Sequence, residues 1–148
     1  MQRIKNGNIY GESTSWGIMR ILIDTDVLLD FALGREPSAS ASRQVIAWAE
    51  ANPGHAAVAW HSLSNIAYLA PSGARSFLAE LLDFVEVPPT GTVDAIGAMK
   101  FPMRDLEDAL QASAALNFQA DYVISRNARD YKGSPVPAMT PEEYLSRR

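Results

Sequence analysis

The acidic residues near the start of the chain have the types and spacing to hold a metal ion. Asp24 and Asp26 follow the apolar run 21–23, and Asp30 comes about one helical turn later. An apolar run of this kind is typical of a buried strand in a parallel sheet. Asp24 would then stand at the carboxyl end of the strand, where open α/β sheets bind their ligands. A buried acid at that place is unfavourable unless something compensates its charge.

Further polar side chains stand three residues apart at the starts of later predicted helices. These pairs are Ser62 and Asn65, Asp105 and Asp108, and Asn127 and Asp130. Because helix starts and strand ends share one edge of a parallel sheet, these pairs are expected to converge with Asp24 on one cleft. Carboxylate and amide oxygens without a nearby His or Cys suit a hard cation such as Mg²⁺ or Mn²⁺.

The same acids also have a simpler interpretation as helix caps. Acids at helix starts accept bonds from free backbone amides and meet the positive end of the helix dipole. Taken singly, Asp105, Asp108 and Asp130 fit this role better than metal binding, and Asp105 is expected to be the pure cap of its pair. Asp30 and Glu107 are expected to be solvated helix residues.

Composition limits the class of protein. The chain has 148 residues, 47% of them hydrophobic, which indicates one globular domain with a real core. The absence of cysteine excludes disulfides, zinc–thiolate sites and cysteine nucleophiles, and fits a reducing cytoplasm. The net charge of −4 argues against nucleic-acid binding by bulk charge alone. This net charge is compatible with a nuclease, because a bound divalent cation makes the local charge of an acidic site positive.

The first residues differ from the rest of the chain. Residues 1–16 are polar, aperiodic and rich in Gly, Ser and Asn, and they lack the apolar segment of a secretory signal. No apolar run approaches the ~20 residues that span a bilayer, so no membrane anchor is expected. Residues 1–18 are therefore predicted to be a leader that is disordered or not native, and residues 19–148 to form a single domain. An ordered extension that packs on a neighbour is the alternative.

Predicted strands alternate with predicted helices along the rest of the chain. The strands are expected at 21–23, 56–60, 85–87 and 122–124, with a weaker one at 136–139. Helices are expected to follow Asp26, to run over 38–51, 62–69, 77–82, 92–99 and 106–118, and to open again at Pro141. This alternation predicts an α/β fold, a three-layer α/β/α sandwich around a parallel sheet of four to five strands.

Four motifs carry a resemblance to a known family. They are ILIDTDVLLD at 21–30, SLSNIAY at 62–68, DLEDALQ at 105–111 and SRNARDY at 125–131. From Met19 to its end the chain resembles the PIN domain, and in particular the VapC-like toxins of bacterial and archaeal toxin–antitoxin pairs. The motifs occur in the family's order and at its spacing.

The resemblance assigns roles to individual residues. It implies Asp24 and Asp108 as catalytic and metal-binding acids, with Asn127 and Asp130 as further metal ligands and Asp26, Asn65, Asp105 and Ser125 in support. Two of these positions depart from the common pattern, because most members have Glu at the position of Asn65 and many have Asp at that of Asn127. Asp26 stands where Asn or Ser is commoner and would restore one negative charge.

The resemblance also implies an activity and its partners. It implies an Mg²⁺- or Mn²⁺-dependent endoribonuclease that cuts single-stranded RNA to leave a 5′-phosphate, acting as a cytoplasmic toxin with a cognate antitoxin and forming a homodimer. Arg104, Arg126 and Arg129 flank the predicted cleft and are expected to hold the RNA backbone, or otherwise to be solvated surface charges. Phe31, Leu33 and the helix 38–51 are expected to form the docking groove for the antitoxin or a second copy.

Two other functions are compatible with these residues. One is a degenerate PIN module that binds RNA or a partner without cutting, which Asn65 and Asn127 favour. The other is a haloacid-dehalogenase-type phosphohydrolase with Asp24 as nucleophile and Asp26 as acid and base, because the first motif is similar to that family's. Of the remaining candidates, His61 is expected to be an exposed turn residue rather than a general base, and Trp60 a core residue.

Overall fold

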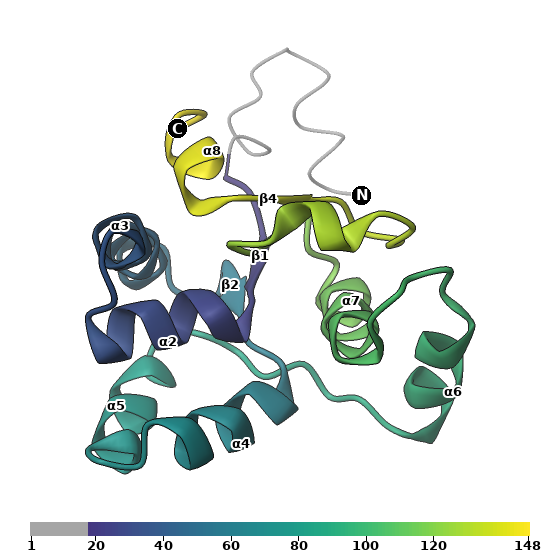
Figure 1. Ribbon diagram of the computed structural model, residues 1–148, viewed down its shortest axis with the longest axis horizontal. Coiled ribbons are helices and arrows are strands. Elements are labelled where there is room, and N and C mark those ends of the chain that lie inside the picture. The colour runs from purple at the N-terminus through teal and green to yellow at the C-terminus, as the bar shows by residue number, and fades with distance from the viewer. Residues whose placement is uncertain (1–17) are drawn as a thin grey trace.

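The computed structural model describes residues 18–148. Four short parallel strands form one central sheet in the order β2-β1-β3-β4 (Figure 1). Their bounds are Ile21–Ile23 for β1, Ala56–Ala57 for β2, Tyr122–Ile124 for β3 and Ala138–Met139 for β4. The parallel α/β fold with a four-stranded sheet is therefore confirmed. The leader predicted at residues 1–18 lies outside the described residues except for Ile18.

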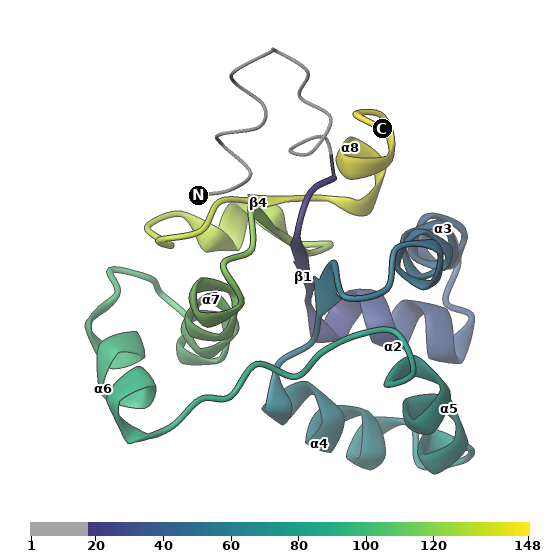
Figure 2. The same ribbon diagram turned by 180° about the vertical axis from the view of Figure 1, so that it is seen from behind.

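Helices cover both faces of this sheet. They are α2 (Thr25–Leu33), α3 (Ser38–Ala51), α4 (Trp60–Leu69), α5 (Ala74–Leu81), α6 (Thr92–Lys100), α7 (Leu106–Phe118) and α8 (Pro141–Leu145), with a 3₁₀ turn η2 (Ala128–Tyr131). In Figures 1 and 2, α2 and α3 lie on one side of the sheet, α7 lies on the other, and α6 lies outside α7. Among residues 18–148, no helix has both the length and the apolar character needed to span a membrane.

The alternation of side chains along β1 explains the two layers of core. Ile21 and Ile23 belong to the cluster that includes Val45 and Tyr144 from the α3 and α8 side. Leu22 points to the opposite face, into the cluster that includes Phe118 of α7. All three residues of β1 are fully buried, as expected of a central parallel strand. The sheet is thus a rigid platform, and its strand ends fix where the polar residues after β1 and β3 lie.

Several element boundaries differ from the prediction. The strand expected at 85–87 is a single parallel bridge between Glu86 and Ala57, and the strand expected at 56–60 ends at Ala57. Trp60 instead begins α4 and is 70% exposed, so its prediction as a core residue is wrong. Ser62 is an internal residue of α4 rather than its cap. The predicted cap at Asp105 is confirmed, because its carboxylate accepts a bond from the amide of Asp108 at 3.1 Å.

Candidate metal centre

A polar cleft opens at the carboxyl ends of β1 and β3. Its volume is about 450 Å³, and its walls come from α2, α4, the start of α7 and the loop after β3. The lining includes nine of the residues singled out in the sequence, namely Asp24, Asp26, Asn65, Asp105, Asp108, Ser125, Arg126, Asn127 and Asp130. Glu107 and Arg35 join them. Residues scattered over the chain therefore lie together, as strand ends and helix starts of a parallel sheet must.

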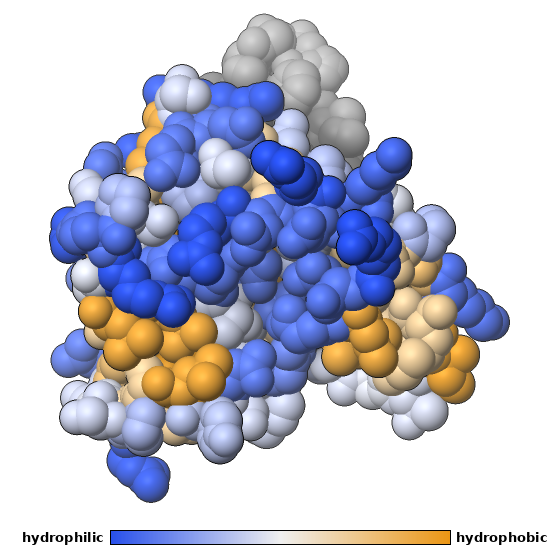
Figure 3. Space-filling model, in the orientation of Figure 1, coloured by the Kyte–Doolittle hydropathy of each residue, from blue (hydrophilic) through white to orange (hydrophobic). Residues whose placement is uncertain are grey.

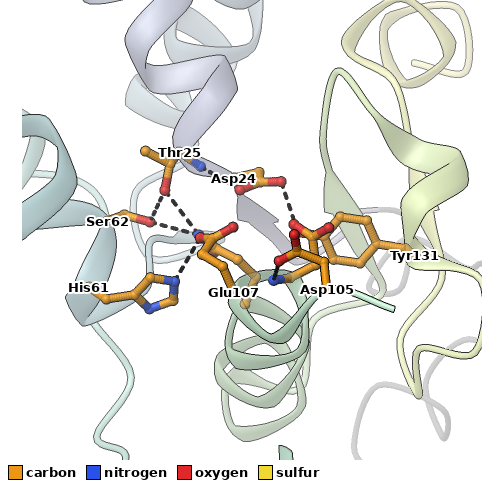
Figure 4. A network of polar contacts seen from close by, with 9 residues as sticks. Asp24, Thr25, His61, Ser62, Asp105, Glu107 and Tyr131 are labelled. Carbon is orange, nitrogen blue, oxygen red and sulfur yellow. Dashed lines mark hydrogen bonds and ion pairs between the residues drawn. The ribbon is translucent and has the colours of Figure 1, made fainter. Parts of the chain in front are cut away.

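Asp24 is the most constrained acid in the cleft. It is the N-cap of α2, and its Oδ1 accepts a bond from the amide of Thr25 at 2.7 Å. The hydroxyl of Tyr131 donates to its Oδ2 at 2.8 Å (Figure 4). Burial, followed by the charges of Asp26 and Glu107, raises the pKa of Asp24 to about 7 even though Tyr131 opposes the shift. Ionised Asp24 is thus held in one orientation but lacks compensating positive charge.

Asp26 is held by the loop that follows β3. Its Oδ2 accepts bonds from the Ser125 hydroxyl at 3.3 Å and the Asn127 side-chain amide at 3.2 Å. Its Oδ1 accepts a bond from the backbone amide of Arg126 at 3.3 Å. Burial raises the pKa of Asp26, and these contacts with Arg126 oppose the shift. Ser125 and Asn127 therefore act on Asp26 in this structure, and their contact ties α2 to the end of β3.

The first turn of α7 carries a cluster of acids. Oxygen atoms of Asp105, Glu107 and Asp108 all lie within 4.8 Å of one another. Burial, followed by the charges of Asp24, Glu107 and Asp105, raises the pKa of Asp108 to about 8. Asp105 belongs to this cluster even though its carboxylate also accepts the capping bond from the amide of Asp108. Capping and metal binding are therefore compatible at this helix start.

Glu107 lines the cleft, and although its side chain is 44% exposed, as a solvated helix residue would be, its carboxylate has specific partners. Its Oε2 accepts bonds from Gln111 Nε2 at 3.0 Å and pairs with His61 Nε2 at 2.9 Å (Figure 4). Burial opposes ionisation of Glu107, yet the bonds from His61 and Gln111 bring the pKa of this carboxyl below its usual value. His61 lies in the first turn of α4 rather than in an exposed turn, so that prediction is wrong.

A buried hydrogen-bond network beneath Glu107 joins three helices. The hydroxyl groups of Thr25 in α2 and Ser62 in α4 lie 2.7 Å apart. The Nε2 atom of Gln111 in α7 donates to both at 3.0 Å, and Gln111 and Ser62 are fully buried. The network fixes the distance between Asp24 and the α7 acids. The sequence offered one signal for it, because Glu107 and Gln111 are four residues apart and share a helix face.

Asp30 was predicted to be solvated, and this prediction is wrong. Its side chain is 1% exposed and pairs with the guanidinium groups of Arg126, at 2.8 and 2.9 Å, and Arg35, at 3.0 Å. Arg126 is thus engaged in an ion pair rather than being only a solvated surface charge. Arg104 and Arg129 are exposed and are not among the residues that line the cleft.

Comparison with known proteins identifies the class. The family model of the PIN domain matches residues 20–129, and the chain belongs to the PIN-domain family. This membership removes the haloacid-dehalogenase alternative for Asp24 and Asp26. Comparison with curated protein sequences gives no match.

Solved toxin–antitoxin complexes share the fold. The structure of VapBC2 from Rickettsia felis bound to a promoter DNA fragment matches with a TM-score of 0.60 and 15% identity, over 82% of this chain and 98% of that one. A toxin–antitoxin complex from Klebsiella pneumoniae matches with a TM-score of 0.60 and 21% identity, over 82% and 97%. FitAcB from Neisseria gonorrhoeae matches with a TM-score of 0.54 and 14% identity, over 82% and 98%. At these identities the likeness establishes the fold.

Proposed function

We propose that this protein is an endoribonuclease that cuts single-stranded RNA with the help of Mg²⁺ or Mn²⁺ and acts as the toxin of a toxin–antitoxin pair. The observation that carries the proposal is the convergence of Asp24 with the acids of α7 in one cleft, with the pKa of Asp24 raised to about 7 and that of Asp108 to about 8. Family membership supports nuclease chemistry at this place.

The donor set fits a hard divalent cation. The cleft presents carboxylate oxygens from the start of α2 and from α7. Burial, followed by repulsion between these acids, raises the pKa values of Asp24 and Asp108, and a bound positive charge would favour their ionised forms. We assign Asp24 and Asp108 as the principal ligands, with Glu107 beside them and Asn127 and Asp130 at the opposite rim. These residues would hold the cation, which would supply an activated water and neutralise charge on the phosphodiester.

Residues of the chain itself prepare the site. Tyr131 and the Thr25 amide orient Asp24, while Ser125, Asn127 and the Arg126 amide hold Asp26. Glu107 contributes the negative charge that the family usually draws from the position of Asn65, because both residues line the cleft. The contacts of Glu107 with His61 and Gln111 keep this carboxylate ionised and directed inward.

An antitoxin and a second copy of the chain are further proposed partners. A groove of about 270 Å³ lies between α2, α4 and α5, with Phe31, Leu33 and Phe77 in its walls. Figure 3 shows an apolar patch over this part of the molecule, and Leu33 in the groove wall is exposed. The solved structures of similar fold are toxin–antitoxin complexes, which supports an antitoxin as a partner, and we propose this groove as its docking site. We propose a cytoplasmic location as well, in keeping with an RNA substrate.

The experiment is cleavage of a 5′-labelled single-stranded RNA at increasing Mn²⁺ or Mg²⁺. We expect the parent to cut, the Asp24→Ala and Asp108→Asn variants to be inactive, and Asp83→Asn, at an exposed acid outside the cleft, to equal the parent. Equal cleavage by parent and Asp24→Ala would contradict the proposal. RNA binding by a parent that never cuts would favour the degenerate PIN module.

A further inference from the structure

We propose that Arg35 and Arg126, positioned by the buried carboxylate of Asp30, form a binding subsite for an RNA backbone phosphate next to the one that is cut. This inference rests on the proposed ribonuclease function and adds a substrate contact to it. Asp30 acts here as a positioning residue, while the two guanidinium groups make the contact.

The geometry of the ion pairs fixes both arginines. Arg126 Nη1 contacts both carboxylate oxygens of Asp30, and Arg35 Nε contacts Oδ1. The two guanidinium groups therefore share one oxygen atom and are neighbours. Asp30 lies inside the apolar side of α2, where its side chain is 1% exposed, while the side chains of Arg35 and Arg126 are 44% and 43% exposed. The anchor is thus buried and the cations remain accessible from the cleft.

The backbone holds both arginines in place as well. Helix α2 ends at Gly34, whose left-handed conformation (φ 63°) turns the chain back toward the helix. The amide of Arg35 then donates to the carbonyl of Asp30 at 2.9 Å. On the other side, the amide of Arg126 donates to Asp26 at 3.3 Å. Each arginine is therefore tied to α2 through its main chain and its side chain, which lowers the entropy cost of binding an anion.

Charge is distributed unevenly around the cleft. Among the described residues that line it, Arg35 and Arg126 are the basic ones, and they lie near the end of α2 and the loop after β3. The acids of α7 form another part of the lining. The two positive charges of Arg35 and Arg126 are balanced by the negative charges of Asp30 and Asp26, so the subsite attracts an anion through its remaining N–H donors rather than through excess charge. Arg126 contacts both oxygens of Asp30 through Nη1 alone.

The chemistry of the pair suits a phosphodiester. Asp30 is contacted by Nε of Arg35 and by Nη1 of Arg126. The two terminal nitrogens of Arg35 and Nη2 of Arg126 take no part in these contacts and can donate to a phosphate. Guanidinium groups bind phosphate oxygens through paired N–H donors, which Lys cannot reproduce. RNA that enters an acid-rich cleft meets repulsion, and N–H donors held in fixed positions give one of its phosphates a specific partner there.

The test is binding of a 5′-fluorescein single-stranded RNA by fluorescence anisotropy in Ca²⁺ and in EDTA, at several KCl concentrations. We expect Arg35→Gln to weaken binding about 10-fold and to reduce the log–log salt slope by about 0.7. The matched control is Arg43→Gln, an exposed arginine of α3 outside the cleft. Equal affinities for these two variants would overturn the proposal.

Asp30→Asn distinguishes positioning from bulk charge. This variant removes a negative charge, so bulk electrostatics alone would tighten RNA binding, whereas loss of the anchor is expected to weaken it about 5-fold. Arg126→Lys keeps the charge and is expected to weaken binding as well, and thermal melting shows whether each variant is folded. Tighter binding by folded Asp30→Asn would contradict the proposal.

An RNA cleavage assay of the parent protein distinguishes failure of the subsite proposal from failure of the proposed ribonuclease function. A parent that cuts RNA while Arg35→Gln and Arg43→Gln bind alike refutes the subsite and leaves the nuclease intact. A parent that neither binds nor cuts RNA refutes both.

Discussion

Acids gather in two regions of this molecule, and their side chains have different partners in the two. Asp30 and Asp26, on α2, are matched by Arg35, Arg126 and amide donors. In the other region, no ion pair among residues 18–148 joins Asp24 or Asp108 to a basic side chain, and burial followed by the neighbouring acids raises the pKa of Asp108 to about 8. Glu107, which lies beside them, is paired with His61. The paired region holds the fold together, whereas the unpaired region stores repulsion that a bound cation relieves. On this difference we base the proposal that Asp26 and Asp30 are structural and that Asp24 and Asp108 bind metal.

The largest expected effect is on catalysis by the unpaired region. Replacing Asp24 with Ala or Asp108 with Asn removes a principal metal ligand, and we expect cleavage of single-stranded RNA to fall at least about 100-fold. The measurement is initial rate at saturating Mn²⁺, with Asp83→Asn as the control. If either variant kept more than a tenth of the parent's cleavage rate, the residue replaced in it would not be a principal metal ligand.

The next effect concerns the stability of the paired region. Asp30→Asn breaks charged hydrogen bonds in the core and is expected to lower the free energy of unfolding by about 2 kcal/mol. Urea denaturation measures the change. A stability equal to that of the parent would mean that Asp30 contributes no more than a solvated residue, as its sequence position first suggested.

In a metal-free solution, Asp108→Asn is expected to raise the stability of the protein, whereas Asp30→Asn lowers it. The folded-state pKa values of Asp24 and Asp108 are raised from 3.8 to about 7 and about 8, so the folded protein binds more protons than the unfolded chain between these values. Stability contributed by the protonated forms is therefore present at low pH and lost as pH rises toward 8. We expect Asp108→Asn to raise the melting temperature at pH 8 in EDTA and to flatten its pH dependence. Scans from pH 5 to 9 test this, and an unchanged slope would contradict it.

A smaller effect is expected at Tyr131. Tyr131→Phe removes the hydroxyl that orients Asp24 without changing any formal charge. We expect RNA cleavage to fall about 10-fold or less and stability to fall by about 1 kcal/mol. The pH at which activity appears should also move upward, because the hydroxyl lowers the pKa of Asp24. A profile identical to that of the parent would show that the Thr25 amide alone orients Asp24.

The sequence predicted the parts of this structure that depend on local pattern. The apolar run at 21–23 forms β1, and Asp105 caps α7. The segment 85–87 has the composition of a strand but forms only one bridge, since its pairing depends on the edge that β2 offers. Local pattern also placed Asp24 and Asp108 at strand and helix ends, which is why the two meet at one cleft.

The sequence did not predict the roles of residues whose partners come from distant parts of the chain. Arg126 reaches Asp30 from 96 positions away, and His61 reaches Glu107 from 46. The residues next to Asp30 and Glu107 in the sequence do not indicate these distant partners. Both acids therefore had the pattern of ordinary exposed helix residues. Trp60 was misplaced for a related reason, because the strand that would have buried it ends three residues earlier.

The most direct test of the central claim is the anomalous difference density of a crystal soaked in Mn²⁺. We predict a peak in direct contact with the carboxylates of both Asp24 and Asp108, and its disappearance in crystals of Asp108→Asn. A protein that cuts RNA with Mn²⁺ while its crystals show the ion bound elsewhere, with these two side chains unliganded, would contradict the account.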